Sequence, residues 1–96
     1  MPPDPVREDA EADVLLGRVL RQRRRHLGLS QQDLADLADV GVRLVHEVER
    51  GSTGVRLVNL LRLLGALGLT LELTGPGVGP VRLDPTPVTG PGVPAS

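Results

Sequence analysis

The stretch that most constrains the fold of this chain is residues 29–51, LSQQDLADLADVGVRLVHEVERG, which predicts two short helices joined by a tight turn. Ser30 can cap the first helix with its hydroxyl, and the carboxylate three residues later favours the positive helix end. Asp39 and Gly41 supply turn chemistry, because both residue types tolerate backbone angles that most residues avoid. A second helix with one polar face is expected over about residues 42–50. This arrangement predicts a helix-turn-helix motif.

The chain of 96 residues has room for one small domain. It contains no Phe, Tyr, Trp, Cys or Ile, so Leu, Val and Ala must fill its core. A core of that size is marginal alone, and help from a second subunit is expected. The absence of cysteine excludes a disulfide and a thiolate metal site. The acidic, proline-containing N-terminus is unlike a signal peptide and no apolar run spans a membrane, so we expect a cytoplasmic, nucleoid-associated protein.

Charge is distributed unevenly along the chain, although the net charge is only −1. Residues 1–13 hold five acids against one Arg, whereas residues 14–73 hold nine Arg against six acids, a balance of +3. The body of the chain is therefore basic and the N-terminal segment acidic.

Five segments lie outside the helix-turn-helix motif. Residues 1–10 are expected to be a flexible acidic arm, and a helix is expected over residues 11–27. After the motif, leucines at helical spacing predict a helix from about Leu57. Alternating residues over 69–73 predict one β-strand, which closes a domain of residues 11–74. Half of the residues in 75–96 are Gly or Pro, which predicts a disordered tail.

A lone strand leaves unpaired backbone groups, and an identical strand of a second copy would satisfy them. The fourth helix also carries apolar residues outside its main stripe, which indicates a second partner for that helix. We therefore expect dimer contacts from Leu63, Leu69, Leu71 and Leu73. The alternative is a hairpin within the chain, in which residues 81–83 pair with the strand across the turn at residues 75–77.

The runs LGRVLRQRRRHLGLSQQDLA, VHEVERG and LLRLLGALGLTLEL resemble the Xre family, which includes the phage repressors of Cro and CI type, and the span of residues 16–73 looks most like its HipB-type antitoxin branch. The resemblance implies an all-α, lambda-repressor-like fold of four to five helices with one short C-terminal strand for dimerisation. The partners that it implies are a palindromic operator in double-stranded DNA, a second copy of the chain, and a kinase-like toxin.

The resemblance also assigns roles to residues of the motif. Arg24 and Glu49 would form a partly buried ion pair with a structural role. Base contacts in the major groove are expected from Val42, Arg43, His46 and Glu47. Phosphate contacts are expected from Gln31, Arg50 and Arg21. Arg43 suits the acceptors of guanine best, and Glu47 suits a cytosine amino group.

The chain departs from the family pattern at two positions of the turn. Asp39 stands where the family has Gly, and Gly41 stands where it has Ser or Thr, so the recognition helix lacks a side-chain cap. Glu47 is an acid that faces a polyanion, and it weakens DNA binding unless Arg43 or Arg50 neutralises it or it meets a cytosine.

The chain lacks the side chains that an enzyme active site needs. His26 and His46 are the only histidines, and no hydroxyl or thiol has a base at suitable spacing. No catalytic residue, metal site or cofactor is expected. We expect a sequence-specific repressor, with a HipB-like antitoxin that represses its own operon as the preferred role. The alternatives are an Xre-type repressor without a toxin, and a protein-interaction module that does not read DNA.

Overall fold

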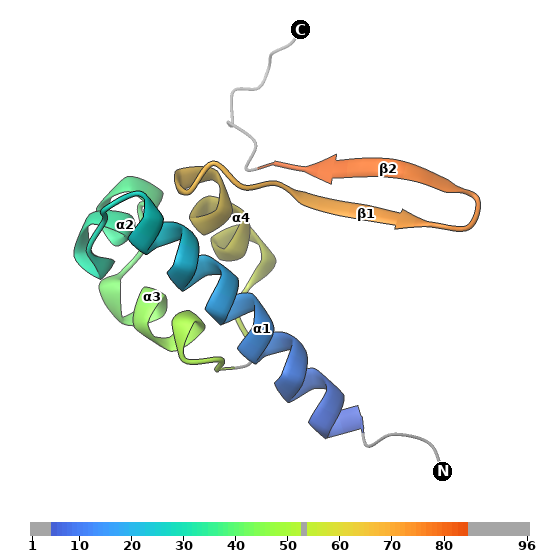
Figure 1. Ribbon diagram of the computed structural model, residues 1–96, viewed down its shortest axis with the longest axis horizontal. Coiled ribbons are helices and arrows are strands. Elements are labelled where there is room, and N and C mark those ends of the chain that lie inside the picture. Colours follow the sequence, from blue (N-terminus) through green and yellow to red (C-terminus); the bar gives the residue numbers. More distant parts are fainter. Residues whose placement is uncertain (1–4, 53, 85–96) are drawn as a thin grey trace, which may run out of the picture.

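The computed structural model describes residues 5–52 and 54–84 (Figure 1). These residues form four helices and a two-stranded antiparallel sheet: α1 (Pro5–His26), α2 (Gln31–Ala38), α3 (Val42–Glu49), α4 (Leu57–Ala66), β1 (Leu71–Gly75) and β2 (Val78–Leu83). The mostly helical architecture confirms the predicted helix-turn-helix fold class. Within the described residues, no helix is long and apolar enough to cross a membrane.

The core is entirely aliphatic and lies where the four helices meet. Each helix contributes to it at least one residue that is only 1% exposed, among them Leu20, Leu34, Val45 and Leu63. α3 packs against α1 and α2, and α2 packs against α4. The helices therefore fix the position of α3 relative to α1, and this pair of helices carries the candidate functional surface.

α1 begins at Pro5, so the prediction of a flexible arm over residues 1–10 is wrong for its last six residues. Pro suits the first position of a helix, where its missing N–H is not needed, and acidic residues suit a helix N-terminus. Residues 1–4 lie outside the described part of the chain. Gly28 and Gly68 each lie two residues past the end of a helix, with positive φ angles of 73° and 71° that suit a helix end.

The predicted strand pairs within the chain rather than standing alone. Leu71 pairs with Leu83 and Leu73 with Val81 in an antiparallel hairpin, which projects from the helical body (Figure 1). The strand begins at Leu71, two residues later than expected. The alternative prediction of a hairpin within the chain is therefore correct. Gly77, directly after Pro76, has a φ of 75°, which suits the turn. Of the predicted tail, residues 78–83 form a strand, and residues 85–96 lie outside the description.

Leu63 was predicted to contact a second subunit, and this prediction is wrong. The side chain is 1% exposed and belongs to the core cluster of the helical body. At Leu63 the surface of α4 is covered within the chain, whereas Leu57 and Val58 of the same helix are 55% and 47% exposed. The other residues expected at a dimer contact differ: Leu69 and Leu71 are half-buried, while Leu73 is 51% exposed.

Candidate nucleic-acid interface

The turn between α2 and α3 has the geometry that its sequence indicates. Asp39 ends α2 with left-handed backbone angles, φ 57° and ψ 49°. Gly41 is the N-cap of α3 and provides no side-chain hydrogen bond, which agrees with the missing cap noted in the sequence. Ala35 is 1% exposed, and this small side chain leaves space for close packing beside α2. Ser30 and Asp33 form a reciprocal capping box at the start of α2, with both bonds 2.9 Å long.

One face of α3 is free of any role in the core. Val45 and Val48 point inward and are buried, while Val42 is 39% exposed and Arg43 and His46 are exposed. Positions 42, 43, 46 and 47 recur at helical spacing, so their side chains share one side of the helix. The four residues expected to contact bases thus lie together on a surface that a groove of DNA can reach.

Glu47 is not an isolated acid on that surface. Its Oε2 lies 3.4 Å from Nε of Arg43, one helical turn away, and the two side chains are 45% and 89% exposed. An exposed pair of this kind contributes little to stability, under about 1 kcal/mol. Its importance is electrostatic, because Arg43 offsets the charge that would otherwise repel a polyanion.

A buried polar network joins α1, the start of α2 and the end of α3. Arg24 donates from Nε to Oε2 of Glu49 over 2.6 Å and from Nη2 to Oε1 over 3.0 Å, so the predicted ion pair is present. The two side chains are only 10% and 4% exposed. Arg24 also donates from Nη1 to the carbonyl of Leu29 over 2.7 Å. The hydrogen bonds to Glu49 raise the pKa of Arg24 above its ordinary value, which keeps the guanidinium charged.

Gln31 belongs to the same network. Its Nε2 donates to Oε1 of Glu49 over 3.2 Å, which positions the amide at the N-terminus of α2. An amide nitrogen carries two donors, and this bond uses one of them. The second donor is left for another acceptor. A phosphate contact from Gln31 stays a prediction.

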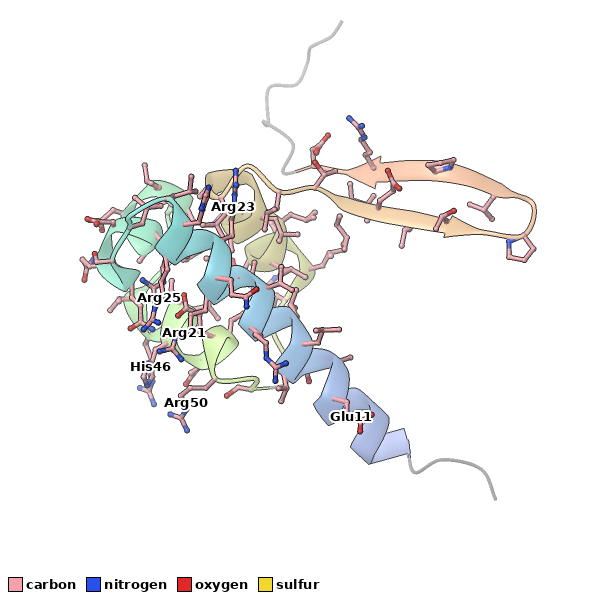
Figure 2. The ribbon with its side chains drawn as sticks, viewed as in Figure 1. Glu11, Arg21, Arg23, Arg25, His46 and Arg50 are labelled. Atoms are coloured by element: carbon pink, nitrogen blue, oxygen red, sulfur yellow. The ribbon has the colours of Figure 1, made fainter. Side chains whose placement is uncertain are left out.

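The basic residues of the surface come from two helices. In the view of Figure 2, Arg21 of α1 projects toward the same side of the helical body as His46 and Arg50 of α3, and the two helices pack against each other. All three side chains are exposed. Arg23 lies elsewhere, because its Nε donates to the carbonyl of Leu67 over 2.9 Å. Arg21 and Arg50, both predicted to contact phosphate, are therefore exposed on two helices that pack against each other, and their phosphate contacts stay predictions.

Sequence reasoning missed Gly17, which sets the distance between α1 and α3. A Cβ built on this residue would overlap the carbonyl oxygen of Val48 and would lie 2.9 Å from that of Glu49. Only glycine lets the end of α3 come this close. The available signal was a glycine inside an otherwise strong helical pattern, which often marks close packing.

The sequence of this chain is similar to those of known proteins. The family model described as a helix-turn-helix domain matches residues 15–75. The uncharacterised HTH-type transcriptional regulator y4mF of Sinorhizobium fredii is 31% identical over 62 residues, which cover 65% of this chain and 82% of that protein. An uncharacterised HTH-type transcriptional regulator of Haemophilus influenzae is 38% identical over 60 residues, or 62% of this chain and 61% of that protein.

A solved structure is also similar. The restriction-modification controller protein C.AhdI of Aeromonas hydrophila has a TM-score of 0.58 and 42% sequence identity. The match covers 62% of this chain and 89% of that chain. The similarity extends to the sequence as well as to the arrangement of the helices.

Proposed function

We propose that this chain, which belongs to the helix-turn-helix family of DNA-binding transcriptional regulators, is a sequence-specific repressor that reads duplex DNA with α3. The observation that carries the proposal is the exposed face of α3, where Arg43 is 89% exposed while the opposite face is buried. An isolated helix face of this shape fits the major groove of B-form DNA.

Arg43 is the main reading residue in this proposal. Its planar fork can donate two parallel hydrogen bonds to O6 and N7 of guanine. Glu47 lies one turn further along α3, 3.4 Å from Arg43, and can accept a hydrogen bond from the amino group of cytosine. Val42 is exposed at the start of the helix and suits the methyl group of thymine. Together these side chains favour a site with a G·C pair next to an A·T pair.

Gln31 fixes the position of the motif on the DNA strand. It stands at the first position of α2, where free backbone amides and the helix dipole favour a phosphate. The bond to Glu49 holds its side chain in place before DNA arrives, which lowers the entropy lost on binding. Gln31 orients α3 in the groove and carries no sequence information.

The repressor acts as a homodimer that forms through the hairpin. Leu73 and Val81 are paired across the strands and are 51% and 46% exposed, so they share one apolar face. A two-stranded hairpin is marginal in water, and an identical hairpin is the partner that symmetry supplies. A two-fold axis would place two recognition helices about 34 Å apart, on the two halves of a palindromic operator.

Within this class, the preferred role is a HipB-like antitoxin that represses its own operon and binds a kinase-like toxin in the cytoplasm. The likeness to C.AhdI, at 42% identity over 89% of that chain, supports a second role as the controller of a restriction-modification system. The neighbouring gene separates the two roles. A kinase-like reading frame in the same transcript favours the antitoxin, and a methyltransferase or endonuclease frame favours the controller.

Selection of bound duplexes from a random pool tests the proposed function. The expected result is a palindromic consensus with half-sites one helical turn apart, or a multiple of it, and a conserved guanine in each half. Recovered duplexes without any shared sequence would contradict sequence-specific binding. A consensus with one half-site would retain the reading role of α3 and contradict the dimer.

A further inference from the structure

A groove lies between the C-terminal halves of α2 and α4, two helices that pack against each other. It has a volume of about 300 Å³, and its lining residues are Leu37 and Ala38 of α2 and Arg62, Gly65 and Ala66 of α4. We refer to it as the α2–α4 groove. None of these residues belongs to α3, and Gln31 stands at the opposite end of α2. The groove is therefore separate from the residues that are expected to contact DNA.

The walls of the groove leave apolar surface uncovered. Leu37 is 62% exposed, more than any other large apolar residue in the described part of the chain. Val58 precedes Arg62 by one helical turn and is 47% exposed, so it extends the wall that α4 provides. Gly65 and Ala66 have little or no side chain, which leaves room for a side chain from outside. The groove can therefore bury an aliphatic side chain against Leu37.

Arg62 gives the groove a positive charge. The side chain is exposed and makes no hydrogen bond or ion pair with any described residue. The sequence has no acid between Glu49 and Glu72, so α4 carries no carboxylate that could neutralise it.

The acids of α2 are engaged elsewhere. The carboxylate of Asp33 accepts a hydrogen bond from the backbone of Ser30, and that of Asp36 accepts one from the amide of Gln32, both over 2.9 Å. The groove thus combines an exposed leucine with an arginine that has no partner within the described chain.

We propose that the α2–α4 groove binds an acidic amphipathic helix of a partner protein, with an aliphatic side chain packed against Leu37 and a carboxylate one helical turn away facing Arg62. Side chains one turn apart lie about 5–6 Å from each other on one face of a helix, so both can enter the same groove. Apolar grooves recognise amphipathic helices in this way, and the charge of Arg62 selects an acidic helix over a basic one. The inference does not depend on DNA binding, because no residue of the groove takes part in the proposed reading of DNA.

The test uses two fluorescent, alanine-rich peptides of about 18 residues, a length at which such peptides can be helical in water. Both carry leucines along one face. The acidic peptide has Glu one turn from these leucines, and the basic peptide has Lys at the same positions. Anisotropy titrations measure the affinity of each peptide, and NMR shifts of backbone amides locate its site. Wild-type protein should bind the acidic peptide at least about tenfold more tightly, with amide shifts at the residues of the groove.

Arg62→Glu should reverse this preference, so that the basic peptide binds more tightly than the acidic one. Arg18→Glu is the matched control, because Arg18 is an exposed arginine of α1 outside the groove and the change alters the net charge equally. The control should keep the preference for the acidic peptide. Leu37→Ala should weaken binding of the acidic peptide roughly tenfold, because the apolar contact is lost. Circular dichroism checks that each variant is folded.

Equal affinities of the wild-type protein for the two peptides would overturn the proposal, as would equal effects of Arg62→Glu and Arg18→Glu. Amide shifts confined to α3 or to the hairpin would place the peptide elsewhere and also overturn it. Sedimentation tests whether a second copy of this chain covers the groove instead. In that case Leu37→Ala should lower the mass of the wild-type protein, and this result would overturn the proposal, whereas an unchanged mass supports a separate partner.

Discussion

Removal of Glu49 should strand a buried arginine and destabilise the whole domain. Glu49 accepts three hydrogen bonds, two from Arg24 at 2.6 and 3.0 Å and one from Gln31 at 3.2 Å. In Glu49→Ala, Arg24 keeps only its bond to the carbonyl of Leu29 while its side chain stays buried. Breaking a buried pair from one side costs about 3–5 kcal/mol, which is a large part of the total stability of a small domain. For a chain of this size the melting temperature should fall by at least about 12 °C.

Urea denaturation followed by circular dichroism, at one fixed protein concentration, measures this loss. Glu47→Ala is the matched control, because Glu47 lies on the same helix in an exposed pair and should cost under about 1 kcal/mol. Arg24→Met removes the stranded charge, so the double variant should be more stable than the sum of the single losses predicts, by about 0.5–3 kcal/mol. Losses that simply add would show that Arg24 and Glu49 are not coupled, and equal losses for Glu49→Ala and Glu47→Ala would show that burial of the pair does not matter.

Three further predictions follow from the contacts of single residues. Gly17→Ala should lower the free energy of unfolding by about 1–3 kcal/mol in urea titrations, because the added Cβ would meet the carbonyl oxygen of Val48. The same change in an exposed helix is stabilising. A Gly17→Ala variant that is more stable than wild type would contradict the close approach of α1 and α3. The pKa of Asp33 is lowered, because its carboxylate accepts hydrogen bonds from the backbone and the hydroxyl of Ser30. The ionised carboxylate therefore stabilises the fold above about pH 4, and this contribution is lost as the pH falls through the lowered pKa. Asp33→Asn should flatten that part of the stability profile, and an unchanged acid limb of thermal melts would contradict it. Leu73→Glu should give monomers with unchanged helix content in sedimentation, whereas an unchanged dimer mass would exclude the hairpin as the dimer contact.

Local chemistry made the helix-turn-helix motif predictable from the sequence. Its three features depend on neighbouring residues only, and the structure has all of them. Ser30 caps α2, Asp39 takes left-handed backbone angles, and Gly41 provides no side-chain cap for α3. The ion pair between Arg24 and Glu49 joins residues 25 positions apart. Spacing alone did not give it, and it came from the resemblance to a family.

Predictions that depended on tertiary packing were less successful. Leu63 lies off the main stripe of α4, and the sequence does not say that other helices of the same chain cover it. The second strand contains Gly79 and Pro80, residue types that usually argue against a strand. Pro is tolerated here because a hairpin has only edge strands, whose outward backbone groups need no partner in the sheet. The candidate base and phosphate contacts stay predictions until DNA binding is measured.

The affinity ratio between the consensus duplex and a scrambled duplex measures how strongly α3 reads the base sequence through Arg43. Wild-type protein should prefer the consensus, and Arg43→Ala should reduce that preference by about 5- to 150-fold, because one bidentate base contact is worth about 1–3 kcal/mol. Binding to the scrambled duplex should change much less. An Arg43→Ala variant that weakens binding to both duplexes by the same factor would contradict the claim and make Arg43 a backbone contact.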